Sequence, residues 1–152
     1  MTESISLPPF EVTWVPGGDR TLQQLGKNLV LYFYPKDSTP GCTTEGLEFA
    51  GLYEKFQGLN TEIIGVSRDS VKSHEKFIEK QGFPFPLISD PDEKLCRHFD
   101  VIQEKNMYGK KVLGVVRSTF VFDAQGNLIQ ALRGVKSKGH AQAILELIQA
   151  RS

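Results

Sequence analysis

The feature that most constrains the fold is a wholly apolar run, residues 29–34, which stops at a turn rich in proline and glycine. Six consecutive apolar residues bounded in this way predict a strand that is buried on both faces of a sheet. Helical spacing of apolar residues follows over residues 43–57, and Gly58 supplies a stop. The chain therefore begins a strand–helix alternation, which is typical of α/β proteins.

The remaining segments continue this alternation and end in a hairpin. Strands are predicted over residues 62–67, 118–122 and 128–132, and helices over 70–81, 91–99 (capped by Asp90) and 139–150. Residues 10–21 predict an N-terminal hairpin, and 85–89 a short edge strand, because Pro84 and Pro86 argue against a central one. We expect one domain, residues 1–152, with a mixed central sheet flanked by helices on both faces.

Charge and composition exclude several classes of protein. The 18 basic and 18 acidic residues cancel, so we expect no nucleic-acid partner. The longest apolar run is far below the ~20 residues that span a bilayer, and the N-terminus lacks a signal-peptide pattern. There are only two cysteines and no CxxC motif, which fits a reducing compartment. The expectation is a cytoplasmic protein that does not contact membranes.

The chemically most informative residue is Cys42, which follows the first buried strand and precedes the first helical run. A cysteine in the first turn of a helix faces unpaired backbone N–H groups and the positive end of the helix dipole, which favour the reactive thiolate. Pro35 restricts the preceding loop, Thr39 offers a hydroxyl to the sulfur or to a bound oxygen, and Gly41 lets a ligand approach the backbone. The alternative, a buried structural thiol, suits its small and polar neighbours poorly.

Other candidate sites in the sequence are weak. His74, His98 and His140 are scattered, and we expect them at the surface or at helix caps. Cys96 and His98 are two positions apart, so on a helix they would point to different faces and make a poor metal pair. Phosphate-binding loops and metalloprotease or hydrolase motifs are missing. We therefore expect neither a metal nor a cofactor.

The string FYPKDSTPGCTTEG resembles the active-site signature of the peroxiredoxins, in particular the bacterioferritin comigratory protein (peroxiredoxin Q) subgroup. The segments FPFPLISD, NMYGKKVLG and RSTFVFDAQGNL are also similar to that subgroup, so the resemblance covers nearly the whole chain. It implies a thioredoxin-like fold, a thiol-dependent peroxidase acting on hydrogen peroxide and organic hydroperoxides, and a monomer.

The resemblance also implies roles for individual residues. Cys42 would be the peroxidatic cysteine, Arg117 would stabilise its thiolate and polarise the O–O bond, and Thr39 would help to hold the peroxide oxygens. Pro35 and Gly41 would line the substrate site. Glu45 would either bond near Arg117 or simply favour the start of the helix.

The chain departs from the subgroup in its second cysteine. The two positions at which members carry a resolving cysteine are Leu47 and Ile78 here, and the other thiol is Cys96, whose position favours packing. We therefore expect an external thiol (thioredoxin, glutaredoxin or glutathione) to reduce Cys42. A two-cysteine cycle with Cys96, a non-enzymatic peroxide sensor or holdase, and a dithiol oxidoreductase remain alternatives, the last opposed by the missing CxxC.

Overall fold

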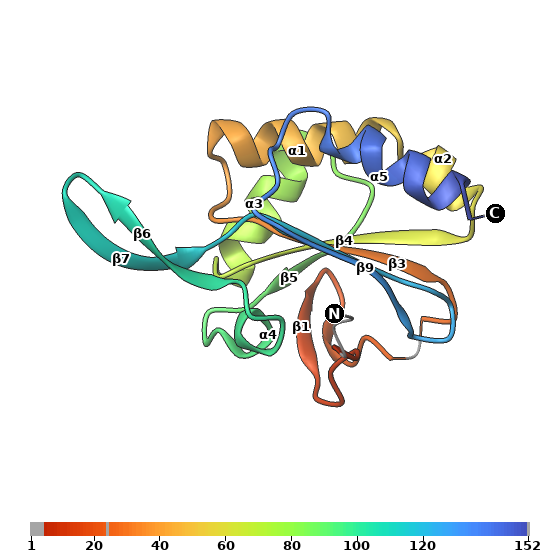
Figure 1. The fold of residues 1–152 in the computed structure, drawn as a ribbon, viewed down its shortest axis with the longest axis horizontal. Helices are drawn as coiled ribbons and strands as arrows, with labels where there is room; N and C mark the ends of the chain where they lie inside the picture. Colours follow the sequence, from red (N-terminus) through yellow and green to blue (C-terminus); the bar gives the residue numbers. More distant parts are fainter. Residues whose placement is uncertain (1–4, 24, 152) are drawn as a thin grey trace.

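A single seven-stranded sheet forms the centre of the computed structural model, which describes residues 5–23 and 25–151. The strand order is β2-β1-β5-β4-β3-β8-β9 (Figure 1). These strands are β1 (Val12–Val15), β2 (Gly18–Arg20), β3 (Asn28–Phe33), β4 (Thr61–Ser67), β5 (Leu87–Ser89), β8 (Ser118–Phe122) and β9 (Leu128–Arg133). The helices are α1 (Pro40–Gly51), α2 (Tyr53–Gln57), α3 (Val71–Gln81), α4 (Lys94–His98) and α5 (His140–Gln149).

The sheet is mixed, as predicted. Strands β3, β4 and β5 are parallel to one another, whereas β1 and β8 run antiparallel to β5 and β3 respectively. Parallel neighbours need crossover connections, and α1–α2 and α3 provide them. Because β3 is central, the chain that leaves its carboxyl end lies where open α/β sheets gather their sites.

Two apolar cores lie on opposite faces of this sheet. Along β3 the side chains alternate between them, with Leu31 and Phe33 in one core and Val30 and Tyr32 in the other. Helices α1, α2 and α5 cover the second core, while α4 and the N-terminal segment cover the first (Figure 1). The apolar run 29–34 is buried along its whole length, which explains why its sequence lacks polar alternation.

The predicted edge position of the fifth strand was wrong. β5 lies inside the sheet between β1 and β4. Pro84 and Pro86 precede the strand rather than interrupting it, so neither removes a ladder donor from residues 87–89. Instead, the Pro86 carbonyl accepts a hydrogen bond from the backbone of Gly65.

The predicted helix over residues 43–57 consists of two helices. The first begins earlier, at Pro40, and the backbone at Leu52 leaves the helical region before α2 starts. The helix predicted over 91–99 is shorter, because α4 begins at Lys94. Asp90 is not its N-cap residue, a position that Glu93 takes, but the Asp90 carboxylate accepts hydrogen bonds from the backbone N–H groups of Leu95 and Cys96 in the first turn.

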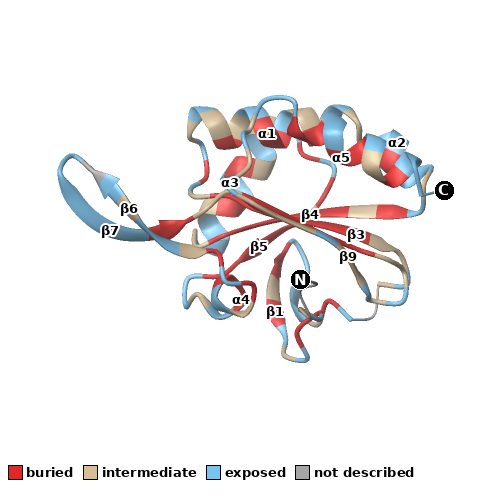
Figure 2. Ribbon diagram, in the orientation of Figure 1, coloured by how far each residue is buried: buried red, intermediate tan, exposed pale blue. Residues whose placement is uncertain are grey.

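A second, two-stranded sheet was not predicted. Strands β6 (Ile102–Met107) and β7 (Lys110–Val115) form a hairpin that projects from the body of the molecule (Figure 1). Most of its surface is exposed (Figure 2), and Tyr108 at its tip is fully exposed. With so few buried positions the hairpin lacks the apolar alternation on which strand prediction depends.

Candidate active site

The segment from β3 to α1 places Cys42 in the first turn of a twelve-residue helix. Thr39 is the N-cap in extended conformation, Pro40 follows at the first helical position, and Cys42 comes two residues later. The thiol is buried, with only 2% of the residue exposed. Its sulfur accepts a hydrogen bond from Nη2 of Arg117 at 3.4 Å. Cys42 and Arg117 are 75 positions apart in the sequence, and the contact that the resemblance implies between them is present in the structure.

One guanidinium bridges the cysteine to a buried carboxylate. Arg117 lies in the short connection between β7 and β8, and its Nη1 donates to Oε1 of Glu45 at 2.6 Å. Glu45 is wholly buried one turn after Cys42 on α1. Because the guanidinium fork is planar and rigid, this pairing fixes the direction in which Nη2 points at the sulfur.

The other carboxylate oxygen of Glu45, Oε2, is buried and finds no hydrogen-bond partner among the described residues. Burial raises the pKa of Glu45 to about 7, although the nearby Arg117 guanidinium lowers it. A carboxyl group that changes charge near neutral pH therefore lies beside the Cys42–Arg117 pair.

The remaining residues expected at the site surround the start of α1. Thr39 is half-buried, and its hydroxyl donates to the Lys36 carbonyl oxygen at 2.8 Å, which leaves its oxygen free to accept. At Gly41 a Cβ atom would lie 3.1 Å from Nη2 of Arg117, so the guanidinium packs against bare backbone there. Pro35 is half-buried at the beginning of the loop.

Cys96 does not join this group. It is buried in the core on the opposite face of the sheet from Cys42. Burial, and next the carboxylate of Asp90, raise the pKa of the Cys96 thiol far above its ordinary value. The structure thus encloses Cys96 as a protonated packing residue and separates it from Cys42 by the central sheet.

Several polar residues near the site carried no signal in the sequence. Lys105 on β6 interacts electrostatically with Arg117 and Cys42, and burial lowers its pKa. Ser137 lies close to the start of α1, because its Oγ would be 3.6 Å from a Cβ at Gly41. Only the tertiary fold brings these residues close to the site. One available signal was that Lys105 directly precedes the NMYGKKVLG segment that supports the resemblance.

The expectation that the histidines lie at the surface or at helix caps was wrong for His74, whereas His140 directly follows the N-cap of α5 but is buried. His74 and His140 are buried, and each is hydrogen-bonded, His74 to Asp37 and His140 to Thr119. Burial lowers the pKa of His140 to about 4, so it is neutral at physiological pH. A buried histidine with a partner cannot be distinguished from an exposed one by its place in a helical pattern.

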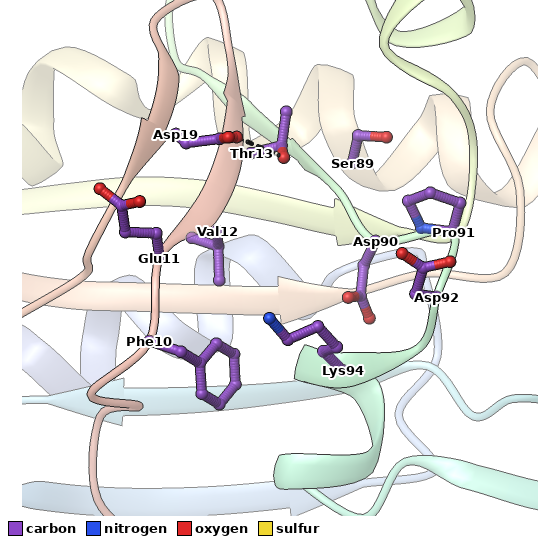
Figure 3. A pocket seen from close by; sticks show the side chains of 10 residues that line it. All are labelled: Phe10, Glu11, Val12, Thr13, Asp19, Ser89, Asp90, Pro91, Asp92 and Lys94. Atoms are coloured by element: carbon purple, nitrogen blue, oxygen red, sulfur yellow. Dashed lines mark hydrogen bonds between the residues drawn. The ribbon is translucent and has the colours of Figure 1, made fainter.

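A hollow away from this site lies between β1 and the start of α4 (Figure 3). It has a volume of about 380 Å³ and includes Asp19 and Asp90 in its lining. Asp19 accepts a hydrogen bond from Thr13, and both oxygens of Asp90 accept from the backbone of α4. Within residues 5–23 and 25–151, no group of acidic, histidine and cysteine side chains has the arrangement of a metal site.

A buried cysteine at the start of the helix that follows a central strand, with an arginine donating to its sulfur, defines a thiol-dependent oxidoreductase on a thioredoxin-like fold. The AhpC/TSA family model matches residues 6–131. Peroxiredoxin Bcp of Xanthomonas campestris is 59% identical over 138 residues, which cover 90% of this chain and 86% of that protein. Peroxiredoxin Bcp of Bacillus subtilis is 48% identical over 127 residues, 84% and 81% of the two chains.

Solved structures agree with the sequence comparisons. A structure of Xanthomonas campestris peroxiredoxin Q superposes with a TM-score of 0.90 at 55% identity, covering 97% of this chain and 96% of that one. Another, described in a study of alkyl peroxide reduction by the bacterioferritin comigratory protein of that organism, gives a TM-score of 0.91 at 53% identity and covers 99% of both chains. The chain belongs to the AhpC/TSA family of peroxiredoxins and is a thiol peroxidase.

Proposed function

We propose that the chain reduces hydrogen peroxide and organic hydroperoxides through Cys42 and is recycled by an external thiol. The Cys42 thiolate attacks the terminal peroxide oxygen, the S–O bond forms as the O–O bond breaks, and the leaving oxygen takes a proton to become water or an alcohol. Sulfur loses two electrons and becomes a sulfenic acid. The observation that carries this proposal is the hydrogen bond from Arg117 to the Cys42 sulfur.

Arg117 suits the developing charges in this step. A guanidinium keeps its proton and donates in a fixed fork, so it stabilises both the thiolate and the negative charge that appears on the leaving oxygen. The hydroxyl proton of Thr39 is already committed to a carbonyl, so its oxygen is free to accept from the peroxide O–H. We assign Thr39 to holding the substrate and Glu45 to orienting Arg117.

Pro35 and Gly41 would shape the space in which the peroxide binds. The ring of Pro35 restricts the loop that leads to Thr39. A side chain at Gly41 would crowd the guanidinium, so glycine leaves room both for Arg117 and for a small oxidant. Pro35 and Gly41 thus determine the shape of the proposed substrate site and add no charge to it.

The sulfenic acid has no second thiol nearby with which to condense. Leu47 is exposed, with 44% of its surface accessible, and Ile78 lies on α3, so neither position offers a sulfur. Cys96 lies in the opposite core and is held protonated. We therefore propose a one-cysteine cycle: a first external thiol forms a mixed disulfide and releases water, and a second thiol restores Cys42.

The reductant would be thioredoxin, glutaredoxin or glutathione, in the cytoplasm, with the chain acting as a monomeric single domain. The sequence has only two cysteines and no CxxC motif, which fits a reducing compartment. No helix within the described ranges has both the length and the apolar character that crossing a bilayer demands.

Steady-state peroxide consumption with thioredoxin, glutaredoxin and glutathione, compared side by side, tests this function. We expect turnover with at least one donor, its loss in Cys42→Ser, and its retention in Cys96→Ser. Wild-type protein that is oxidised once but never turns over with any donor would instead indicate a peroxide sensor. Loss of turnover in Cys96→Ser, with the fold intact, would indicate a two-cysteine cycle.

A further inference from the structure

We propose that Asp37 is a positioning residue for the peroxidase reaction, because it anchors the loop that carries Thr39 and Cys42 to α3. The inference depends on the proposed function of Cys42 and adds a residue to it. Asp37 lies between the central strand β3 and the N-cap of α1, where only 5% of it is exposed. It belongs to a group of four side chains, Tyr34, Asp37, Ser73 and His74, here called the Asp37 cluster.

Three side chains converge on the carboxyl group of Asp37. The Tyr34 hydroxyl donates to Oδ1 at 2.6 Å. The Ser73 hydroxyl donates to Oδ2 at 2.8 Å, and Nδ1 of His74 lies 2.7 Å from the same oxygen. Burial raises the pKa of Tyr34 well above its ordinary value, so its hydroxyl remains a donor at neutral pH.

Both ring nitrogens of His74 have hydrogen-bond partners. Its Nε2 lies 2.8 Å from the carbonyl oxygen of Ile88, which can only accept, so Nε2 carries a proton. Nδ1 lies 2.7 Å from Oδ2 of Asp37, the oxygen that also accepts from Ser73, so the imidazole links the loop to the β5 backbone. A buried carboxyl group with this many hydrogen-bond partners holds its position firmly.

The Asp37 cluster joins three elements that are distant in sequence. Asp37 comes from the loop, Ser73 and His74 from the first turns of α3, and the Ile88 carbonyl from β5. The backbone N–H of Asp37 is also held, because it donates to Oδ2 of Asp69 at 2.9 Å. Asp37 therefore fixes the loop through both its backbone N–H and its side chain.

This anchoring explains how the next residue keeps an unfavourable backbone conformation. Ser38 has a φ of 62°, in the left-handed region that non-glycine residues seldom occupy. Such a conformation persists when the surrounding contacts hold it in place. Thr39, the N-cap of α1, follows directly, so the path from Asp37 through Ser38 sets where Thr39 and Cys42 stand relative to Arg117.

Peroxide reduction depends on the backbone path from Asp37 to Cys42 more than a simple reaction of the thiolate does. Peroxide reduction needs Thr39, the sulfur and the guanidinium in mutual register, whereas alkylation by iodoacetamide needs only an accessible thiolate. A displacement of about 1 Å can cost on the order of 100-fold in rate. Loosening the Asp37 cluster should therefore slow the reaction of Cys42 with peroxide much more than its alkylation.

The test compares two buried aspartates. Asp37→Ala and Asp90→Ala each remove a buried carboxyl group, 5% and 6% exposed, and Asp90 accepts from the backbone of Leu95 and Cys96, which belong to the core away from Cys42. Reduced proteins are mixed with hydrogen peroxide, and separately with iodoacetamide, and the two second-order rate constants of Cys42 are measured together with the melting temperature. Ser73→Ala, which deletes one donor at a half-buried position, repeats the test should Asp37→Ala not fold.

We expect the ratio of the peroxide to the alkylation rate constant to fall about 100-fold in Asp37→Ala, to fall less in Ser73→Ala, and to stay at the wild-type value in Asp90→Ala. An unchanged ratio in a folded Asp37 or Ser73 variant overturns the inference, as does an equal fall in Asp90→Ala. A wild-type protein that does not react with peroxide would instead refute the proposed function, so the two failures are distinguishable.

Discussion

At the scale of single residues, the site depends on one guanidinium that makes two different contacts. Replacing Arg117 by lysine keeps the positive charge but cannot donate to both Glu45 and the Cys42 sulfur in the same geometry. We expect Arg117→Lys to lower the second-order rate constant with hydrogen peroxide by roughly 10²–10³-fold. Stopped-flow measurement checks this, and a variant within tenfold of wild type would contradict it.

Glu45 should make stability depend on pH near neutrality. Its folded pKa, raised by burial from 4.5 to about 7, means that the folded state holds this proton more tightly than the unfolded chain. The contribution to stability is therefore complete below about pH 4.5 and is lost as the pH rises through about 7. Across this pH range, the contribution of the Glu45 proton to the free energy of unfolding falls by about 3 kcal/mol.

Glu45→Gln removes this titration while keeping an oxygen that can accept from Arg117. The stability of wild type relative to Glu45→Gln, from urea denaturation at several pH values, should decrease between pH 4.5 and 7.5. A constant difference across that range would show that Glu45 does not change charge there.

Gly41 should not tolerate a methyl group without a loss of activity. The added Cβ would lie 3.1 Å from Nη2 of Arg117, so the guanidinium must move by a few tenths of an ångström. The backbone itself permits alanine, because Gly41 is helical. We expect Gly41→Ala to retain the wild-type melting temperature within a few degrees and to lose roughly tenfold in peroxide rate; wild-type kinetics would disprove the close approach.

At the scale of elements, the position of α1 depends on the absence of a side chain at Gly46. A Cβ there would lie 2.5 Å from Cζ of Phe83, which is too close for any real contact. Gly46→Ala should lower the free energy of unfolding by about 1–3 kcal/mol through overpacking, despite the better helix propensity of alanine. Gly51→Ala on the same helix, where the Cβ meets nothing within 4 Å, is the control and should be neutral or stabilising in urea denaturation.

The elements also show what sequence patterns can and cannot predict. The run 29–34 identifies β3, because burial on both faces gives a continuous apolar run. The helical spacing of residues 70–81 identifies α3, because burial on one face gives a periodic pattern. The β6–β7 hairpin leaves no such trace, since little of it is buried. The interior position of β5 depends on its pairing with β1, a contact between distant segments that no local pattern encodes.

The site shows the same division. Cys42 and its place at a helix start follow from the sequence, and the resemblance to a known family supplies Arg117 as its partner. Neither predicts the contacts of the Asp37 cluster: Asp37 belongs to the signature string, but its contact with His74 on α3 forms only when folding buries the two residues together. Buried polar pairs between elements are therefore the part of a site that sequence reasoning misses first.

At the scale of the whole molecule, one sheet separates two cores, and we expect them to unfold together. Trp14, the only tryptophan, is 5% exposed in the core on the side away from Cys42, so its fluorescence reports on that side. Urea transitions followed by Trp14 fluorescence and by far-ultraviolet circular dichroism should coincide. Distinct midpoints would show that the chain is not a single cooperative domain.

The central claim is that a hydroperoxide oxidises one particular sulfur, the one beside Arg117. Its most direct test is mass spectrometry after one equivalent of hydrogen peroxide in the presence of dimedone, which traps sulfenic acids. We expect a dimedone adduct on Cys42 and an unmodified Cys96. An adduct on Cys96 alone, or a disulfide between Cys42 and Cys96 in high yield, would contradict it.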